Sequence, residues 1–237
     1  MEAEIISETK DYLVINKPAG LLVHGGIGIV GETLVDWLTK KYPDIKNVGE
    51  DPMRPGIVHR LDRDVSGLMV VCKNQETYDS LKAQFQDRTI KKEYTALVYG
   101  KLSKDEDEID FPIKRATAGF KMAAVPKNFA DHSDDKIRHA VTSISVIKKM
   151  VNYTLLKVNI KTGRTHQIRV HLFAYGHPIV GDNLYCTRIT KLKNLKNKLD
   201  RVFLVSTELE FNDLEGVRQK FQAPLPDSIA KFLETAR

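Results

Sequence analysis

The sequence is most constrained at residues 59–67, HRLDRDVSG, which run directly into the apolar residues 68–72, LMVVC. The apolar part is short, rich in valine and bounded by Gly67 and Lys73, so it predicts a buried strand. The residues before it place one histidine, two arginines and two aspartates against the edge of a core. Such charges must be paired, because an isolated buried charge is strongly destabilising. Two interpretations follow: a structural ion-pair cluster, or a carboxylate held ionised in a pocket to act on a substrate.

Composition sets limits on the class of protein. The chain has 237 residues, a net charge of +6 and a pI of about 9.1, which weakly favours a polyanionic partner. No apolar run approaches the ~20 residues of a membrane helix. The N-terminal residues lack a signal-peptide pattern, and Cys72 and Cys186 share no motif spacing. We expect one cytoplasmic domain over residues 1–237, with reduced thiols and no membrane partner.

Local patterns predict an α+β protein with a mixed, mostly antiparallel central sheet flanked by helices and loops. Residues 101–110 and 114–138 are predicted to be loops, and a long loop of the second kind is often functional. Residues 188–201 are lysine-rich with helical character. The predicted strands are 12–16, 21–24, 68–72, 94–99, 140–148, 152–160 and 202–205, and the predicted helices are 33–41, 75–87, 165–176 and 226–236.

Residues 26–31, GIGIVG, match the dinucleotide fingerprint G-x-G-x-x-G and precede a predicted helix. The fingerprint also needs a second strand ending in an acidic residue ~20 positions further on. Glu50 lies at that distance, but residues 42–49 before it do not predict a strand. A flexible glycine loop is therefore the favoured interpretation, and a nucleotide-dependent oxidoreductase is the alternative.

Other catalytic motifs are missing from the sequence, which contains no P-loop and no G-x-S-x-G elbow. His166 and His171 are five positions apart, so neither a helix nor a strand directs both at one metal. We expect no metal and no cofactor. What remains is Asp62 with arginines nearby. A carboxylate kept ionised by positive charge can act as nucleophile or base, and a structural ion pair accounts for the same residues equally well.

Several motifs occur in a set order over nearly the whole chain: 16–21 (NKPAGL), 59–62 (HRLD) with 66–68 (SGL), 92–94 (KEY), 163–172 (GRTHQIRVHL) and 176–182 (GHPIVGD). Together they resemble the RluA-type family of pseudouridine synthases in the family's order, and two of them are long and specific. One departure is Val65, where the family usually has threonine. The S4 RNA-binding module that precedes many relatives is not expected.

The resemblance implies an isomerase that detaches a uridine of RNA from its ribose at N1, turns the base and rejoins it through C5, without a cofactor. Asp62 matches the family's essential aspartate, which attacks C1′ or abstracts the 2′ proton. Tyr94 matches the tyrosine that stacks on the target base and is proposed to take the C5 proton. Arg169 matches the basic residue that pairs with the aspartate.

The resemblance also implies contacts with RNA. Arg60 matches the arginine that enters the RNA stack where the uridine has flipped out. Arg164 is expected to hold a loop or a phosphate, and His59 and Gln167 complete the substrate-binding set. The expected partner is 23S rRNA or a tRNA stem-loop bound by a monomer, with residues 114–138 and 188–201 as RNA clamps. A solvated surface explains 188–201 equally well, and a non-catalytic RNA-binding relative is the rival to the enzyme.

Overall fold

The computed structural model describes residues 2–26, 31–117, 121–125, 136–197 and 199–236. The chain forms two compact units, one of Met1–Lys92 with Ser206–Pro224 and one of Glu93–Val205 with Leu225–Arg237. Strands β4 (Lys91–Tyr99) and β10 (Leu204–Asn212) each begin in one unit and continue in the other. Both units contain antiparallel strand pairs together with helices, so the predicted α+β class is confirmed.

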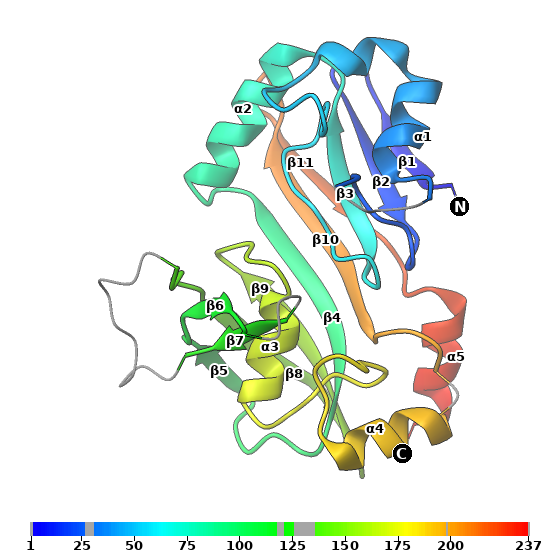
Figure 1. Cartoon of the computed structure of the whole chain (residues 1–237), viewed down its shortest axis with the longest axis vertical. Coiled ribbons are helices and arrows are strands. Elements are labelled where there is room, and N and C mark those ends of the chain that lie inside the picture. The colour runs from blue at the N-terminus through cyan, green and yellow to red at the C-terminus, as the bar shows by residue number, and fades with distance from the viewer. Residues whose placement is uncertain (1, 27–30, 118–120, 126–135, 198, 237) are drawn as a thin grey trace. The chain divides into compact units, whose positions relative to one another are not determined.

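The first unit is a sheet in the order β1-β2-β3-β10-β11 (Figure 1). Strand β3 is buried along its whole length, as its unbroken apolar run predicts. Tyr78 and Leu81 of helix α2 pack on the sheet, and the Asn74 side chain caps this helix by accepting the Thr77 N–H at 2.9 Å. The elements are β1 Glu4–Glu8, β2 Tyr12–Lys17, α1 Leu34–Lys41, the 3-10 turn η1 Pro43–Asn47, β3 Ser66–Cys72, α2 Gln75–Gln86 and β11 Arg218–Gln222.

The second unit has a sheet in the order β4-β9-β8-β5, with β6 and β7 as a separate two-stranded sheet. Helix α3 lies against β7 and β8 (Figure 1). Strands β8 and β9 form the predicted hairpin. The elements are β5 Glu106–Ile109, β6 Ile113–Arg115, β7 Met122–Ala124, β8 Thr142–Lys149, β9 Tyr153–Ile160, α3 Gln167–Ala174, α4 Arg188–Asn197 and α5 Asp227–Thr235.

Several local predictions are wrong. Residues 21–24 form no strand, because the Leu22 and Val23 carbonyls accept the first N–H groups of α1. Residues 101–110 contain β5, which pairs with β8 although its sequence is acidic. Residues 114–138 were predicted to be irregular, yet β6 and β7 form there. Strand β11 was missed because it is polar. The expectations for 27–30, 118–120, 126–135 and 198 lie outside the described residues.

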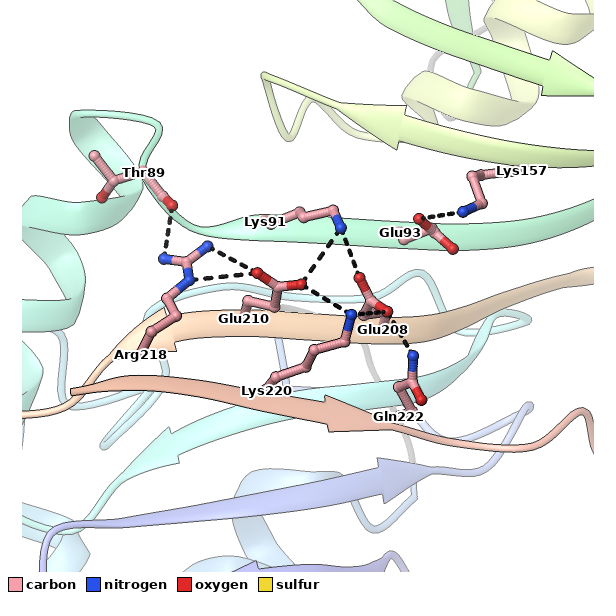
Figure 2. A network of polar contacts seen from close by, with 9 residues as sticks. All are labelled: Thr89, Lys91, Glu93, Lys157, Glu208, Glu210, Arg218, Lys220 and Gln222. Atoms are coloured by element: carbon pink, nitrogen blue, oxygen red, sulfur yellow. Dashed lines mark hydrogen bonds and ion pairs between the residues drawn. The ribbon is translucent and has the colours of Figure 1, made fainter.

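A charged network joins β11 to β10 and to the first residue of β4 (Figure 2). The Glu208 carboxylate is 7% exposed and accepts from Lys91 at 2.7 Å and from Lys220 at 2.8 Å. Gln222 donates to the same carboxylate at 2.7 Å. Burial raises the pKa of Glu208, but the two ammonium groups and the amide outweigh it and hold the pKa well below 4.5.

This network predicts acid sensitivity. Because the folded pKa of Glu208 is lowered, its contribution is complete above the unfolded pKa of ~4.3 and is lost as pH falls through the folded value. We expect Glu208→Gln to lower the free energy of unfolding at pH 7 by about 1–2 kcal/mol. The difference from wild type should shrink as the pH falls below ~4 in urea unfolding curves. Glu215→Gln, at an exposed position, is the control, and a pH-independent difference would contradict the prediction.

Candidate active site

The segment that carries Asp62 is fixed to β3 through His59. The Val70 N–H donates to Nε2 of His59 at 3.0 Å, and the imidazole stacks on Phe85 with ring centroids 4.8 Å apart. Burial lowers the pKa of His59 to about 3, and the charge of Lys92 acts in the same direction. The ring is therefore neutral, with Nε2 as an acceptor. His59 thus accepts a hydrogen bond from the backbone of β3 and anchors the segment that leads to Asp62.

Asp62 begins a tight turn. Its carbonyl accepts the Val65 N–H at 3.2 Å, while Arg63 and Asp64 are exposed at the tip. The Asp62 side chain is half-buried, and Val65 is only 3% exposed. Gly67 follows with φ 119°, and a Cβ there would lie 2.2 Å from the Ser206 carbonyl of β10. The glycine after the turn thus lets β3 lie close to β10, which fixes the exit of the Asp62 turn.

Lys17 joins this turn to residues 18–21. Its side chain is fully buried, and Nζ donates to the carbonyls of Pro18 and Leu21 at 2.8 Å each and of Arg63 at 3.2 Å. The Gly20 N–H also donates to the Arg63 carbonyl at 2.7 Å. From the sequence, Lys17 had no part beyond the matching segment 16–21, and this role was missed. The available signal was a lysine at the end of an otherwise apolar strand.

We expect Lys17→Met to lower the free energy of unfolding by about 2–4 kcal/mol, because it leaves buried carbonyls without their donor. The Asp62 turn should loosen at the same time. Thermal unfolding and amide exchange at residues 62–65 measure the two effects. Lys10→Met, at an exposed position before the same strand, is the matched control. Equal melting temperatures for the two variants would contradict the role of Lys17.

Arg60 lies on the exposed side of the same segment. Its Nη1 donates to Nε2 of His24 at 2.8 Å, and Nδ1 of His24 contacts the Gly25 carbonyl at 2.9 Å. The first unit therefore holds His59, Arg60 and Asp62 within four residues, each with a different environment. His59 is hydrogen-bonded to the backbone of β3, Arg60 faces solvent, and Asp62 is half-buried.

The remaining predicted site residues belong to the second unit. Tyr94 lies in β4 opposite Val158 and is 5% exposed. Helix α3 begins at Gln167, because His166 adopts a left-handed conformation with φ 55°, so the predicted start of this helix at residue 165 is wrong. Nδ1 of His166 lies 2.9 Å from the Tyr185 hydroxyl.

Gln167 is buried, and its amide is engaged inside the protein on both sides. Its Oε1 accepts from the Thr162 hydroxyl at 2.8 Å and from the Arg164 N–H at 3.1 Å. Its Nε2 donates to the Val141 carbonyl at 2.9 Å and to the Thr142 hydroxyl at 3.1 Å. Gln167 thus shapes the loop that presents Arg164, whose exposed side chain donates through Nε to the His139 carbonyl at 3.3 Å.

The network extends to His171, which is fully buried. Its Nε2 lies 2.8 Å from the Phe111 carbonyl, so this nitrogen carries the hydrogen, and Nδ1 accepts from Thr142 at 2.9 Å. Burial lowers the pKa of His171, which keeps the ring neutral. These contacts give both histidines of the 163–172 segment a structural part. Among the described residues, no three histidine, cysteine or acidic side chains gather as a metal site requires.

Arg169 forms a buried ion pair with Asp182. Nε donates to Oδ2 at 2.7 Å and Nη2 to Oδ1 at 3.0 Å, and the side chains are 3% and 0% exposed. Oδ1 also accepts the N–H groups of Leu184 and Tyr185 at 2.9 Å each. Asp182 was missed as a residue of interest, although it ends the matching segment GHPIVGD. It orients the guanidinium of Arg169 and turns the chain after it.

The lysine-rich segment forms helix α4, which buries polar side chains and exposes apolar ones, the reverse of an ordinary surface helix. Asn194 faces inward and accepts from the Tyr99 hydroxyl at 2.7 Å and the Gly181 N–H at 2.9 Å. Ile189, Leu192 and Leu195 are 67%, 55% and 71% exposed.

In the part of the chain that the structure describes, no helix is long and apolar enough to cross a membrane.

A family model and a solved structure show the class of protein to which this chain belongs. Residues 11–174 match a family model described as RNA pseudouridylate synthase. The solved structure of a human protein, RNA Pseudouridylate Synthase Domain Containing 4, has the same fold, with a TM-score of 0.74 and 25% sequence identity. The match covers 98% of this chain and 92% of the human chain. The fold and the matched residues are therefore those of an enzyme that isomerises uridine in RNA.

Two bacterial relatives are similar over the whole chain. An uncharacterised RNA pseudouridine synthase of Bacillus subtilis is 37% identical over 100% of this chain and 74% of its own. Ribosomal large subunit pseudouridine synthase D of Pseudomonas aeruginosa is 38% identical over 100% and 72%. This chain belongs to the RluA-type family of RNA pseudouridine synthases, so it is an isomerase with RNA as its substrate.

Proposed function

We propose that this enzyme forms pseudouridine in large-subunit rRNA, with a tRNA stem-loop as the second candidate, using Asp62 and no cofactor. The observation that carries the proposal is the Asp62 turn, which Lys17 and His59 hold from both sides. Such support keeps a reactive carboxylate in one position before substrate binds. The relatives named for the large ribosomal subunit, 34–38% identical over 97–100% of this chain, favour rRNA.

In the proposed reaction the N1–C1′ bond of uridine breaks and a C5–C1′ bond forms. Asp62 starts the first step, either by attack on C1′ or by removal of the 2′ proton. In the first route formation of the C5–C1′ bond displaces the Asp62 carboxylate again, and in the second Asp62 returns the proton to C2′. Tyr94 then stacks on the base and takes the C5 proton, while N1 is protonated. Arg169 is proposed to pair with the Asp62 carboxylate. Its bidentate contact with Asp182 supports this role, because it fixes the direction of the guanidinium plane.

The proposed RNA contacts divide by exposure. Arg60 and Arg164 are exposed and meet RNA directly, Arg60 in the stack of bases and Arg164 at a phosphate. His59 and Gln167 act by holding the segments that present those arginines, since their ring nitrogen and amide are engaged inside the protein. The net charge of +6 supports a phosphate-binding surface whose contribution weakens with salt.

The test is pseudouridine mapping on unmodified large-subunit rRNA and tRNA transcripts treated with purified protein. We expect one or a few new pseudouridines after dialysis against chelator and without added cofactor. Modification of tRNA alone would select the second candidate, and no modification of either RNA would reject the target. A thermal shift with NAD(P) would revive the oxidoreductase alternative. A cytoplasmic monomer with a single catalytic domain stays a prediction.

A further inference from the structure

His24 has one feature that the proposed function leaves unused. Its Nε2 accepts the guanidinium of Arg60 at 2.8 Å, and its Nδ1 lies 2.9 Å from the Gly25 carbonyl. A carbonyl can only accept, so Nδ1 carries the hydrogen and Nε2 is left as the acceptor. The two hydrogen bonds thus run in one direction: Arg60 donates to the imidazole, and the imidazole donates to the Gly25 carbonyl. The contact fixes an otherwise exposed arginine.

We infer that His24 is a positioning residue that holds Arg60 ready for the RNA stack and releases it when the imidazole takes up a proton. The inference rests on the proposed role of Arg60. Protonation would place a hydrogen on Nε2, so that two donors and two positive charges would face each other. A long, exposed arginine loses side-chain entropy when it enters a base stack. A partner that orders it beforehand removes part of that cost from binding.

The charged groups around His24 are compatible with this device. Burial lowers the pKa of His24 below 6.5, and the charges of Arg60 and Arg54 lower it further, while the Gly25 carbonyl and Asp51 oppose them. Arg54 is itself paired with Asp51 at 3.2 Å, so this pair contributes little net charge at the ring. His24 is therefore neutral at pH 7, the contact is present there, and it is lost as the pH falls through the lowered pKa.

The experiment measures kcat and KM for the mapped RNA between about pH 5 and pH 8. His24→Ala should raise KM about five- to tenfold at neutral pH, which corresponds to the net value of one typical hydrogen bond, with little change in kcat. His24→Gln places an oxygen near the position of Nε2 and does not titrate, so it should rescue most of the loss. The wild-type KM should rise on acidification, and the Gln variant should lack that rise.

Arg60→Ala separates this inference from the proposed function. In that background His24→Ala should have no further effect on KM, because its action passes through Arg60. A wild-type KM for Arg60→Ala would reject the role of Arg60 itself. An impaired Arg60→Ala with an unimpaired His24→Ala would reject only the positioning role. A lower KM in His24→Ala would show that His24 holds Arg60 away from RNA, which also overturns the inference. Lys10→Ala, at an exposed position, is the control.

Discussion

Asp62→Asn protein is expected to fold, to bind its RNA and to form pseudouridine at least roughly 10³-fold more slowly than wild type. Asparagine has nearly the same size, and the turn at residues 62–65 closes through the backbone carbonyl of residue 62, so the substitution leaves that hydrogen bond in place. An amide is neither a useful nucleophile nor a base at neutral pH. The loss should therefore appear in the rate at saturating RNA, while the affinity for RNA stays similar.

The measurement is a single-turnover assay on the mapped uridine, with melting temperature and RNA affinity measured on the same preparations. Asp64→Asn is the matched control, because Asp64 lies on the same turn with its side chain exposed. It makes the same chemical change two residues away. If both variants modify the uridine at rates comparable to wild type, Asp62 is not the catalyst and another group starts the reaction.

Much of the fold was predictable because it depends on local sequence. The valine-rich run that becomes β3 and the Asn74 cap of α2 both act within a few residues. Strand β11 was not predictable in this way, since its RQKFQ sequence becomes a strand only beside the carboxylates of β10. The missed strand β5 has the same cause, because an acidic segment acquires strand structure from its pairing with β8.

The same distinction between local sequence and tertiary contacts applies to the residues of the site. Asp62, Tyr94 and Arg169 were chosen because family motifs mark residue types, and motifs do not show which contacts those residues make. Lys17 reaches a carbonyl 46 positions away, and no periodicity predicts a contact with backbone at that separation. Gln167 resembled a substrate contact by its place in a polar motif, yet tertiary folding uses its amide to close a loop. The roles of such supporting residues are therefore set by the tertiary fold and not by local sequence.

Removing either partner of the Arg169–Asp182 pair is expected to lower the free energy of unfolding by about 3–5 kcal/mol, because the other charge stays buried. Both side chains are almost fully buried, and two hydrogen bonds of 2.7 and 3.0 Å join them. Arg169→Met and Asp182→Asn test this in urea unfolding. The double variant should lose less than the sum of the two single losses, since it removes both charges. Additive losses would contradict a direct pair.

The same two variants test whether Arg169 also acts on Asp62. Both should be unstable, so single-turnover rates are compared at a temperature where each is folded. Asp182→Asn keeps the arginine, whereas Arg169→Met removes a positive charge that would favour the ionised form of its partner carboxylate. If Arg169 pairs with Asp62, Arg169→Met lowers the single-turnover rate more than Asp182→Asn does. Equal rates in the two variants would confine Arg169 to its structural pair with Asp182.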